Sequence, residues 1–186
     1  AEGKAVIERA KLLPRQEFKL RRQALVRMTH SSTAIEGNIL NVREVEALAN
    51  NQKIDAPSRD VYEVENYLKA LKYIEQVVKE KRPVTNTVIL KIHRLVTTKT
   101  LSIESSGKYR KHRVYVVRRY ADGRQEVMYT APAANQVVGL MDNLIQWIQQ
   151  STSQQINPVI VAGIVHQEIA AIHPFADGNG RTARAL

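Results

Sequence analysis

Apolar residues recur at three- and four-residue steps along most of this chain, and this helical period is the strongest constraint on its fold. The clearest example lies between residues 58 and 82, where one buried helix face is predicted. That face carries Val61, Val64, Tyr67, Leu68, Leu71 and Ile74. The same period predicts further helices over residues 16–36, 41–52, 85–101, 135–151 and 157–173.

Two of these helices have patterns that suggest how they pack. The 135–151 helix is expected to turn five apolar residues inward, namely Val138, Met141, Leu144, Ile145 and Ile148. The 157–173 helix is apolar on almost every side, so we expect it to be central in the helical bundle.

One region departs from the helical period. Short β-favouring runs at residues 114–117 and 126–129 flank an Ala-Asp-Gly-Arg segment, which is a turn signal. These features predict a β-hairpin, and because a lone hairpin is marginally stable, we expect it to lean on the helices. The predicted fold class is therefore mainly α, a helical bundle with a small β-hairpin.

The chain carries a net charge of +10 over 186 residues, concentrated in two basic clusters at residues 11–27 and 108–124. Such charge is typical of proteins that bind nucleic acid, acidic surfaces or phosphorylated ligands, but solvated helix and hairpin faces are the favoured explanation. Aromatic residues are few, and no stacking platform or DNA-reading motif is present. A basic nucleic-acid-binding helical domain is kept as the non-enzymatic alternative, and is not the expected function.

The sequence contains no cysteine, which excludes disulfides, thiolate metal sites and a cysteine nucleophile. No apolar run approaches the roughly 20 residues that a membrane-spanning helix needs. The first residues alternate charged and apolar side chains and lack the core of a signal peptide. We expect a cytoplasmic protein without membrane partners.

The residues best suited to chemistry gather in the last stretch, Ala-Ala-Ile-His-Pro-Phe-Ala-Asp-Gly-Asn-Gly-Arg-Thr-Ala-Arg-Ala-Leu. Pro174 interrupts the preceding helix, and the Asp177-Gly178-Asn179-Gly180 loop is predicted to turn tightly into a new helix. A glycine-rich turn at a helix start presents backbone N–H groups to an anion. Arg181 and Arg184 lie three residues apart on one face of that helix and add two guanidinium groups that suit phosphate.

Two more residues of this stretch fit phosphate chemistry. Asp177 can hold Mg²⁺ that bridges phosphates, and His173 can accept a proton near neutral pH. Each residue alone has an ordinary structural explanation, in which His173 caps a helix and the arginines are solvated. The set is not a Walker A loop, because the Lys-Ser/Thr pair is missing. The combination within about a dozen residues favours a nucleotide-phosphate site over a simple helical corner.

The run His-Pro-Phe-Ala-Asp-Gly-Asn-Gly-Arg from His173 to Arg181, followed by Arg184, resembles the signature of the Fic-domain protein adenylyltransferases, or AMPylators. The Gly-Lys-Tyr-Arg segment at residues 107–110, the hairpin and the helix after it resemble the flap region of this family. The segment around Ser32, Glu36 and Gly37 resembles its inhibitory motif, Ser/Thr-x-x-x-Glu-Gly/Asn. Since this motif precedes the signature, the chain resembles the class whose inhibitory helix lies N-terminal to the Fic core.

The resemblance implies transfer of AMP from ATP to a Ser, Thr or Tyr hydroxyl of a target protein. His173 would act as the general base, and Asp177 would hold Mg²⁺ on the phosphates. The Gly178-Asn179-Gly180 loop would cradle phosphate oxygens. Arg181 would bind the β-phosphate and Arg184 the γ-phosphate.

Two further roles follow from the resemblance. The hairpin around Val114, Tyr115 and Val116 would be the flap, which aligns a target segment by strand pairing. Glu36 would pair with Arg184 in the place that the γ-phosphate needs, so that ATP binds unproductively.

The resemblance also divides the chain into an N-terminal helical segment, residues 1–40, with the inhibitory motif, and a Fic core, residues 41–186. We expect this core to be truncated, because family members continue with further helices. Removal of AMP by the same site stays open as an alternative, with the glutamate aligning water. Phosphate transfer, as in Doc-type relatives, is less favoured because those lack the glycine next to the arginine. The target protein and the oligomeric state, a homodimer included, are left open.

Overall fold

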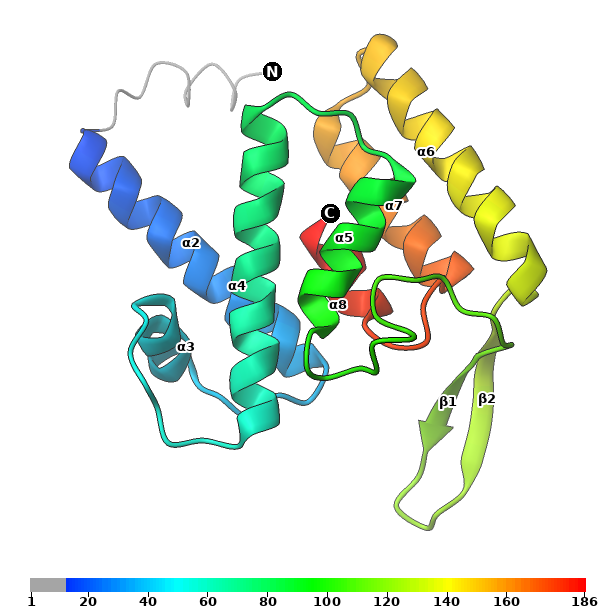
Figure 1. Cartoon of the computed structure of the whole chain (residues 1–186), viewed down its shortest axis with the longest axis horizontal. Helices are drawn as coiled ribbons and strands as arrows, with labels where there is room; N and C mark the ends of the chain where they lie inside the picture. The colour runs from blue at the N-terminus through cyan, green and yellow to red at the C-terminus, as the bar shows by residue number, and fades with distance from the viewer. Residues whose placement is uncertain (1–12) are drawn as a thin grey trace.

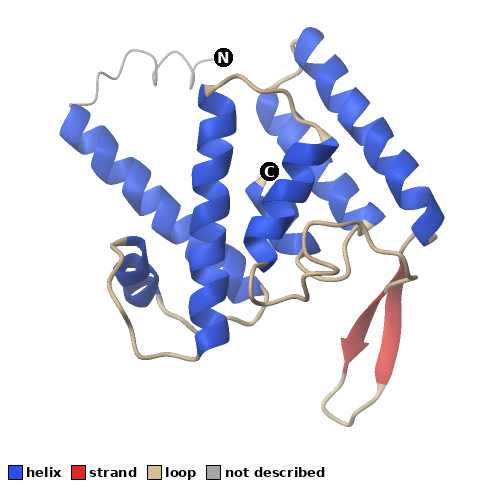
Figure 2. Cartoon of the chain, in the orientation of Figure 1, coloured by secondary structure: helices blue, strands red, loops and turns tan. Residues whose placement is uncertain are grey.

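The computed structural model describes residues 13–186, so the first twelve residues of the expected N-terminal segment lie outside the described part. The described residues form seven α-helices, one 3₁₀ turn and one two-stranded antiparallel sheet (Figures 1 and 2). The prediction of a mainly α fold with a small hairpin is confirmed. The elements are α2 (Pro14–Ile35), α3 (Val42–Ala49), α4 (Ser58–Lys79), α5 (Asn86–Thr97), β1 (Tyr115–Arg119), β2 (Gln125–Thr130), η1 (Ala134–Gln136), α6 (Val137–Ser153), α7 (Pro158–Ile172) and α8 (Asn179–Ala185).

Local sequence signals set several helix ends. The Asn41 side chain accepts hydrogen bonds from the N–H groups of Arg43 (2.9 Å) and Glu44 (3.1 Å), which caps α3. The Thr85 side chain caps α5 in the same way. Gly37 follows α2 with a φ of +90°, a backbone conformation that favours glycine, so the chain turns away directly after Glu36.

The core is assembled around α4 and α5, which pack against each other near the middle of the molecule (Figure 1). On one side, α2 and α3 share a buried cluster with α4 that includes Val26, Val45 and Val64. On the other side, buried residues of α6, α7 and α8 surround Phe175. Helix α8 contacts α2, α4, α5 and α7, so the stretch richest in candidate site residues lies where both halves of the bundle meet.

The prediction for the inward face of α6 was wrong at one position. Val138 is 53% exposed, whereas Val137 is completely buried. Met141, Leu144, Ile145 and Ile148 are buried as predicted. Both Val137 and Val138 lie at helical steps from Met141, so the period alone does not choose between them, and the packing of α6 buries Val137.

The prediction that the 157–173 helix is central was also wrong. Helix α7 packs mainly against α6 and α8, and its buried residues are Val165, Ile169 and Ile172. Val159 and Ile160 on other faces are 80% and 57% exposed. Apolar character all round a helix therefore did not reveal which face is buried. No helix within residues 13–186 combines the length and apolar character needed to cross a membrane.

The hairpin projects away from the helices (Figure 1). Strands β1 and β2 pair antiparallel with a bulge between Val116 and Val117, and every residue of both strands is exposed. Val114 lies just before β1, and its carbonyl accepts a hydrogen bond from the Ala131 N–H (3.3 Å). The Tyr129 hydroxyl donates to the Ala171 carbonyl (2.7 Å), so the hairpin base is attached to the last turn of α7.

Candidate functional site

The turn between α7 and α8 is built from two residues with left-handed backbone. His173 caps α7 with φ 50° and ψ 57°, and its N–H donates to the Ile169 carbonyl (2.9 Å). Gly178 precedes α8 with φ +76°. A Cβ at Gly178 would lie only 2.8 Å from the Thr97 methyl carbon, so both the backbone angle and the close approach to α5 require glycine there.

The Asn179 side chain holds the loop closed. Its Oδ1 accepts the Phe175 N–H and its Nδ2 donates to the Phe175 carbonyl, both at 2.9 Å. The Phe175 ring is completely buried and anchors the loop in the core. Because both polar atoms of the Asn179 amide are bonded to the backbone of the loop, this side chain shapes the turn and is not available to a ligand.

His93 of α5 supports the loop between α7 and α8. The sequence analysis did not identify it as a site residue. Its ring stacks on Phe175 with a centroid distance of 3.7 Å and an interplanar angle of 3°. The Gly107 N–H donates to His93 Nδ1, and His93 Nε2 lies 2.9 Å from the Asp177 carbonyl. The sequence carried no local signal for this role, because these partners are 14 and 84 residues away.

Arg110 is a second buried residue that supports the site. Its guanidinium donates to four main-chain carbonyls, those of His173 (2.7 Å), His112 (2.9 Å), Pro132 (2.7 Å) and Ile172 (3.3 Å). Its side chain thereby joins both ends of the hairpin to the end of α7. Its place in the Gly-Lys-Tyr-Arg segment was the signal that could have identified it.

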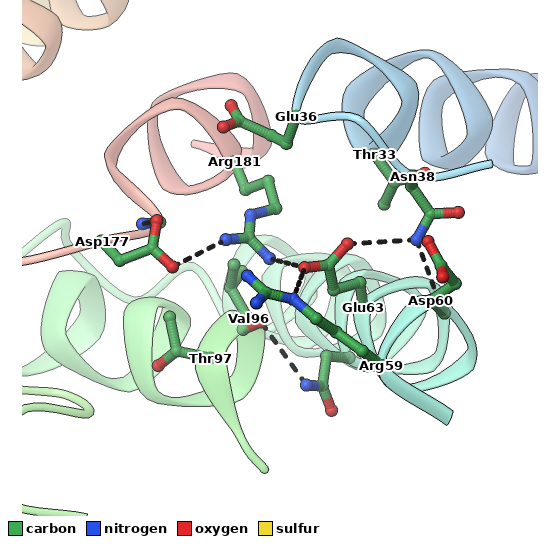
Figure 3. Close-up of polar contacts among 12 residues, drawn as sticks. Thr33, Glu36, Asn38, Arg59, Asp60, Glu63, Val96, Thr97, Asp177 and Arg181 are labelled. Atoms are coloured by element: carbon green, nitrogen blue, oxygen red, sulfur yellow. Dashed lines mark hydrogen bonds and ion pairs between the residues drawn. The ribbon is translucent and has the colours of Figure 1, made fainter. Parts of the chain in front are cut away.

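Arg181 is almost completely buried beneath the loop, with 2% of its side chain exposed. Figure 3 shows its guanidinium between two acids, with Nη2 3.4 Å from Asp177 Oδ2 and Nη1 3.4 Å from Glu63 Oε1. Nη1 and Nε are nevertheless buried without a hydrogen-bond partner. Leaving buried donors of a charged group unpaired is costly, so this position is suited to an anion that supplies the missing acceptors.

Glu63 connects Arg181 to the segment that follows α2 (Figure 3). Its carboxylate accepts hydrogen bonds from Asn38 Nδ2 (3.1 Å) and Arg59 Nε (3.2 Å). Sequence reasoning missed this residue, although a glutamate beside the apolar stripe of α4 is unusual enough to have been noticed.

Arg184 reaches across to the C-terminal turn of α2. Its Nη2 lies 2.6 Å from Glu36 Oε1 and 3.0 Å from the Ser32 carbonyl, while its Nε donates to Ser32 Oγ (3.0 Å). Gly180 lies directly beside this ion pair, and a Cβ there would collide with the Glu36 carboxylate and the Arg184 guanidinium. The structure therefore brings together Ser32, Glu36 and Arg184, which the sequence placed about 150 residues apart.

The His173 imidazole is half-buried at the edge of this cluster. Burial lowers its pKa below 6.5, and the charge of Arg110 lowers it further, while the Ala170 carbonyl, Glu36 and Asp177 oppose the shift. Nδ1 lies 3.4 Å from the Ala170 carbonyl, which can only accept, so this long contact favours the tautomer with the proton on Nδ1. Nε2 is then unprotonated and able to accept a proton at neutral pH.

Asp177 is the residue best placed to hold a cation. Its Oδ1 accepts the Gly178 N–H (2.6 Å), and its side chain is 42% exposed. Among residues 13–186, no group of three or more His, Cys, Asp or Glu side chains could hold a metal ion by itself. One accessible carboxylate beside the Arg181 guanidinium fits Mg²⁺, which is commonly bound by one or two carboxylates together with substrate phosphates.

The residues of the hairpin predicted to dock a target lie apart from this cluster. Tyr115 and Val116 are on the exposed strand β1, and Val114 is at its foot. They are connected to the cluster through Arg110 and through Tyr129, both of which contact the end of α7.

Residues 83–186, more than half of the chain, match the sequence model of the Fic/DOC family. The chain belongs to the Fic/DOC family. This confirms the resemblance to the Fic family, whereas the class with an N-terminal inhibitory helix stays a prediction. The protein adenylyltransferase Fic of Drosophila virilis is 30% identical over 170 residues, which cover 90% of this chain and 33% of that protein. The Drosophila grimshawi protein of the same name is 30% identical over 187 residues and is covered to 34%.

Solved structures agree with this assignment. A Fic family protein from Desulfovibrio desulfuricans G20 is similar over 97% of this chain and 52% of its own, with a TM-score of 0.79 and 28% identity. Fic-1 from C. elegans is similar over 94% of this chain and 50% of its own, with a TM-score of 0.75 and 25% identity. This Fic/DOC chain spans about a third of the length of the curated relatives it matches.

Because His93 is buried, we expect part of the stability of the fold to be lost at acidic pH. Burial lowers its pKa from 6.5 to about 4, and Arg181 contributes in the same direction, against the hydrogen bond and charge of Asp177. Between these pH values the unfolded chain binds a proton that the folded chain does not, so this stability is present above pH 6.5 and is lost as the pH falls toward 4. The shift corresponds to about 3 kcal/mol.

We expect wild type to lose about 3 kcal/mol more unfolding free energy between pH 7 and pH 4 than the His93→Gln variant does. Urea unfolding of both proteins at the two pH values measures this difference. An identical pH dependence of the two proteins would show that His93 titrates normally in the folded state.

Proposed function

We propose that this Fic/DOC chain carries a protein adenylyltransferase site, which transfers AMP from ATP to a Ser, Thr or Tyr hydroxyl of a target protein. The observation that carries the proposal is the buried guanidinium of Arg181, which lies between the Asp177 and Glu63 carboxylates while Nη1 and Nε have no hydrogen-bond partner. Arg184 follows on the same helix, and the turn that begins at His173 leads into that helix. The names of the curated relatives support the choice of reaction.

His173 is the proposed general base. Its Nε2 takes the proton from the target hydroxyl as that oxygen attacks the α-phosphorus of ATP. The bond between the α-phosphorus and the oxygen that bridges to the β-phosphate breaks, and pyrophosphate leaves. Support comes from the half-buried imidazole with a lowered pKa and from the αL backbone, which turns this residue out of the end of α7.

Arg181 and Arg184 are the proposed phosphate ligands. Arg181 would bind the β-phosphate, whose oxygens would supply the acceptors that its buried nitrogens lack. Arg184 would bind the γ-phosphate once it is free of Glu36. The Gly178-Asn179-Gly180 loop would cradle phosphate oxygens through the main-chain N–H groups of Asn179 and Gly180, because the Gly178 N–H donates to Asp177 Oδ1 and the Asn179 side chain is committed to Phe175.

Asp177 is the proposed Mg²⁺ ligand. Its accessible carboxylate would hold the cation together with phosphate oxygens, and the bound cation would supply charge neutralisation for the triphosphate. Its Oδ1 accepts the Gly178 N–H and its Oδ2 lies 3.4 Å from Arg181 Nη2, so a cation would bind through the remaining lone pairs of this carboxylate.

Glu36 is the proposed inhibitor of the site. Its ion pair with Arg184 and the two Ser32 contacts occupy the guanidinium that the γ-phosphate would need. We propose residues 1–40 as the inhibitory segment and residues 41–186 as the Fic core. The described part of the inhibitory segment packs on that core through contacts of α2 with α3, α4 and α8.

The hairpin is the proposed docking element for the target. A strand of the target would pair with the exposed backbone of β1 near Tyr115 and Val116, and side-chain identity would matter little in that mode. The hydrogen bond from Arg110 to the His173 carbonyl would keep the hydroxyl of the docked target aligned with the general base.

Two radioactive forms of ATP test the reaction. With Mg²⁺ and a cell lysate, label from [α-³²P]ATP is expected to enter protein, and label from [γ-³²P]ATP is not. The control is Asp177→Asn, which keeps the shape of the side chain and should not transfer. Incorporation of label from [γ-³²P]ATP alone would show that the reaction is phosphate transfer and not AMP transfer. If the Glu36→Gly variant incorporates label from neither form of ATP, the proposed function is refuted.

The reverse reaction has one observation in its favour. The charge of the Glu36 carboxylate opposes the lowering of the His173 pKa by burial, so Glu36 faces the proposed base and could align a water there in place of a target hydroxyl. Incubating wild type with the labelled protein and Mg²⁺ distinguishes the directions, because only an AMP-removing enzyme would release labelled AMP.

A further inference from the structure

His93 occupies the centre of the site without belonging to its phosphate chemistry. It lies on α5, is completely buried, and both of its ring nitrogens have main-chain partners. The Asp177 carbonyl can only accept and the Gly107 N–H can only donate, so Nε2 carries the proton and Nδ1 accepts. The two contacts together demand one neutral tautomer.

The first of these contacts acts directly on the residue proposed to bind the cation. His93 holds the Asp177 carbonyl, and the Asp177 side chain turns back to accept the Gly178 N–H through Oδ1. Gly178 in turn lies against the Thr97 methyl, one helical turn beyond His93. The main chain on both sides of the Asp177 carboxylate is therefore supported by α5.

The second contact extends to the base. Gly107 lies three residues before Arg110, whose Nε donates to the His173 carbonyl and whose N–H donates to the Pro174 carbonyl. Through the Gly107 N–H, His93 holds the segment that contains Arg110, which supports His173. Through Nε2, His93 also holds the Asp177 carbonyl. Stacking on Phe175, which lies between these two residues, adds a third contact to the same loop.

We propose that His93 is a positioning residue, which holds the Asp177 carbonyl through Nε2 and the Gly107 amide through Nδ1 and thereby sets how the Asp177 carboxylate meets a divalent cation. This inference rests on the proposed role of Asp177. A residue that only filled the core would be replaceable by another flat ring of similar size, whereas a positioning residue needs both nitrogens.

His93→Phe separates these possibilities, because it keeps the stack on Phe175 and removes both hydrogen bonds. In the Glu36→Gly background, with a non-hydrolysable ATP analogue bound, Mn²⁺ affinity is measured by electron paramagnetic resonance. We expect the Mn²⁺ dissociation constant to rise roughly tenfold or more, as is typical when a partner of a metal ligand is removed. Affinity for the analogue without metal should change by less than about twofold, since the arginines are untouched.

The matched control is His166→Phe, the same substitution at an exposed position of α7, which should leave Mn²⁺ affinity unchanged. In His93→Ala, added imidazole is expected to restore Mn²⁺ affinity. Unchanged Mn²⁺ affinity in a folded His93→Phe variant would overturn the proposal.

A measurement on the unsubstituted chain needs no variant to fold. Long-range ¹H–¹⁵N correlation spectra at pH 7 are expected to show His93 as the Nε2–H tautomer, and an Nδ1–H tautomer would overturn the proposal. The Mn²⁺ affinity and the His93 tautomer are both measured without a target protein. If they behave as expected while Glu36→Gly transfers no AMP, the proposed function fails and the positioning role stands.

Discussion

His173→Ala is expected to abolish AMP transfer while ATP still binds. The imidazole is the one group at the turn between α7 and α8 that can take up the hydroxyl proton at neutral pH, and general-base catalysis is typically worth about 10²–10⁴ in rate. The proposed phosphate ligands Arg181 and Arg184 belong to α8 and do not depend on the His173 side chain. Label incorporation and calorimetric titration with ATP measure the two quantities separately.

The backbone at His173 calls for a second variant. Its φ of +50° is unfavourable for alanine, so loss of activity in His173→Ala could follow from a shifted loop. His173→Asn is the suitable companion, because asparagine tolerates this conformation well and lacks the base. Both variants should bind ATP like wild type and fail to transfer, and wild-type-like transfer by either would remove His173 as the base.

Glu36→Gly is expected to raise AMP transfer and self-modification at least roughly tenfold, which corresponds to about 1.4 kcal/mol in the barrier. The substitution removes the carboxylate that lies 2.6 Å from Arg184 Nη2 and so frees the guanidinium for the γ-phosphate. Glu36 is the capping residue at the end of α2, with φ −89° and ψ 7°, and glycine adopts these angles readily. The helical bundle should therefore persist, and the rate of label incorporation reports on the ion pair.

Two control variants accompany this measurement. Glu36→Gln keeps the size of the side chain and removes its charge, so it should activate as well if the ion pair is what inhibits. Arg184→Ala also breaks the pair but lacks the proposed γ-phosphate ligand, so it should stay slow. Equal rates for wild type and Glu36→Gly would count against the inhibitory role of Glu36.

Much of the helical fold was predictable because its signals are local. The period of α4, the Asn41 cap of α3 and the turn at Gly37 are each set by residues within a few positions of one another. The hairpin was predictable from its turn residues for the same reason. The phase of α6 and the buried face of α7 were not, because an apolar residue can face a neighbouring helix or solvent, and only packing decides which.

The candidate site also has one part that local sequence predicts and another part that depends on the packing of distant helices. By itself the sequence determined that an imidazole, a carboxylate, two glycines and two guanidiniums follow one another through a tight turn into a helix, since backbone geometry makes such neighbours meet. Only the tertiary structure decided that α5 places His93 under the loop, that α4 sets Glu63 against Arg181, and that α2 brings Glu36 to Arg184. These contacts join residues between about 80 and 150 positions apart, and such pairs meet only when whole helices pack.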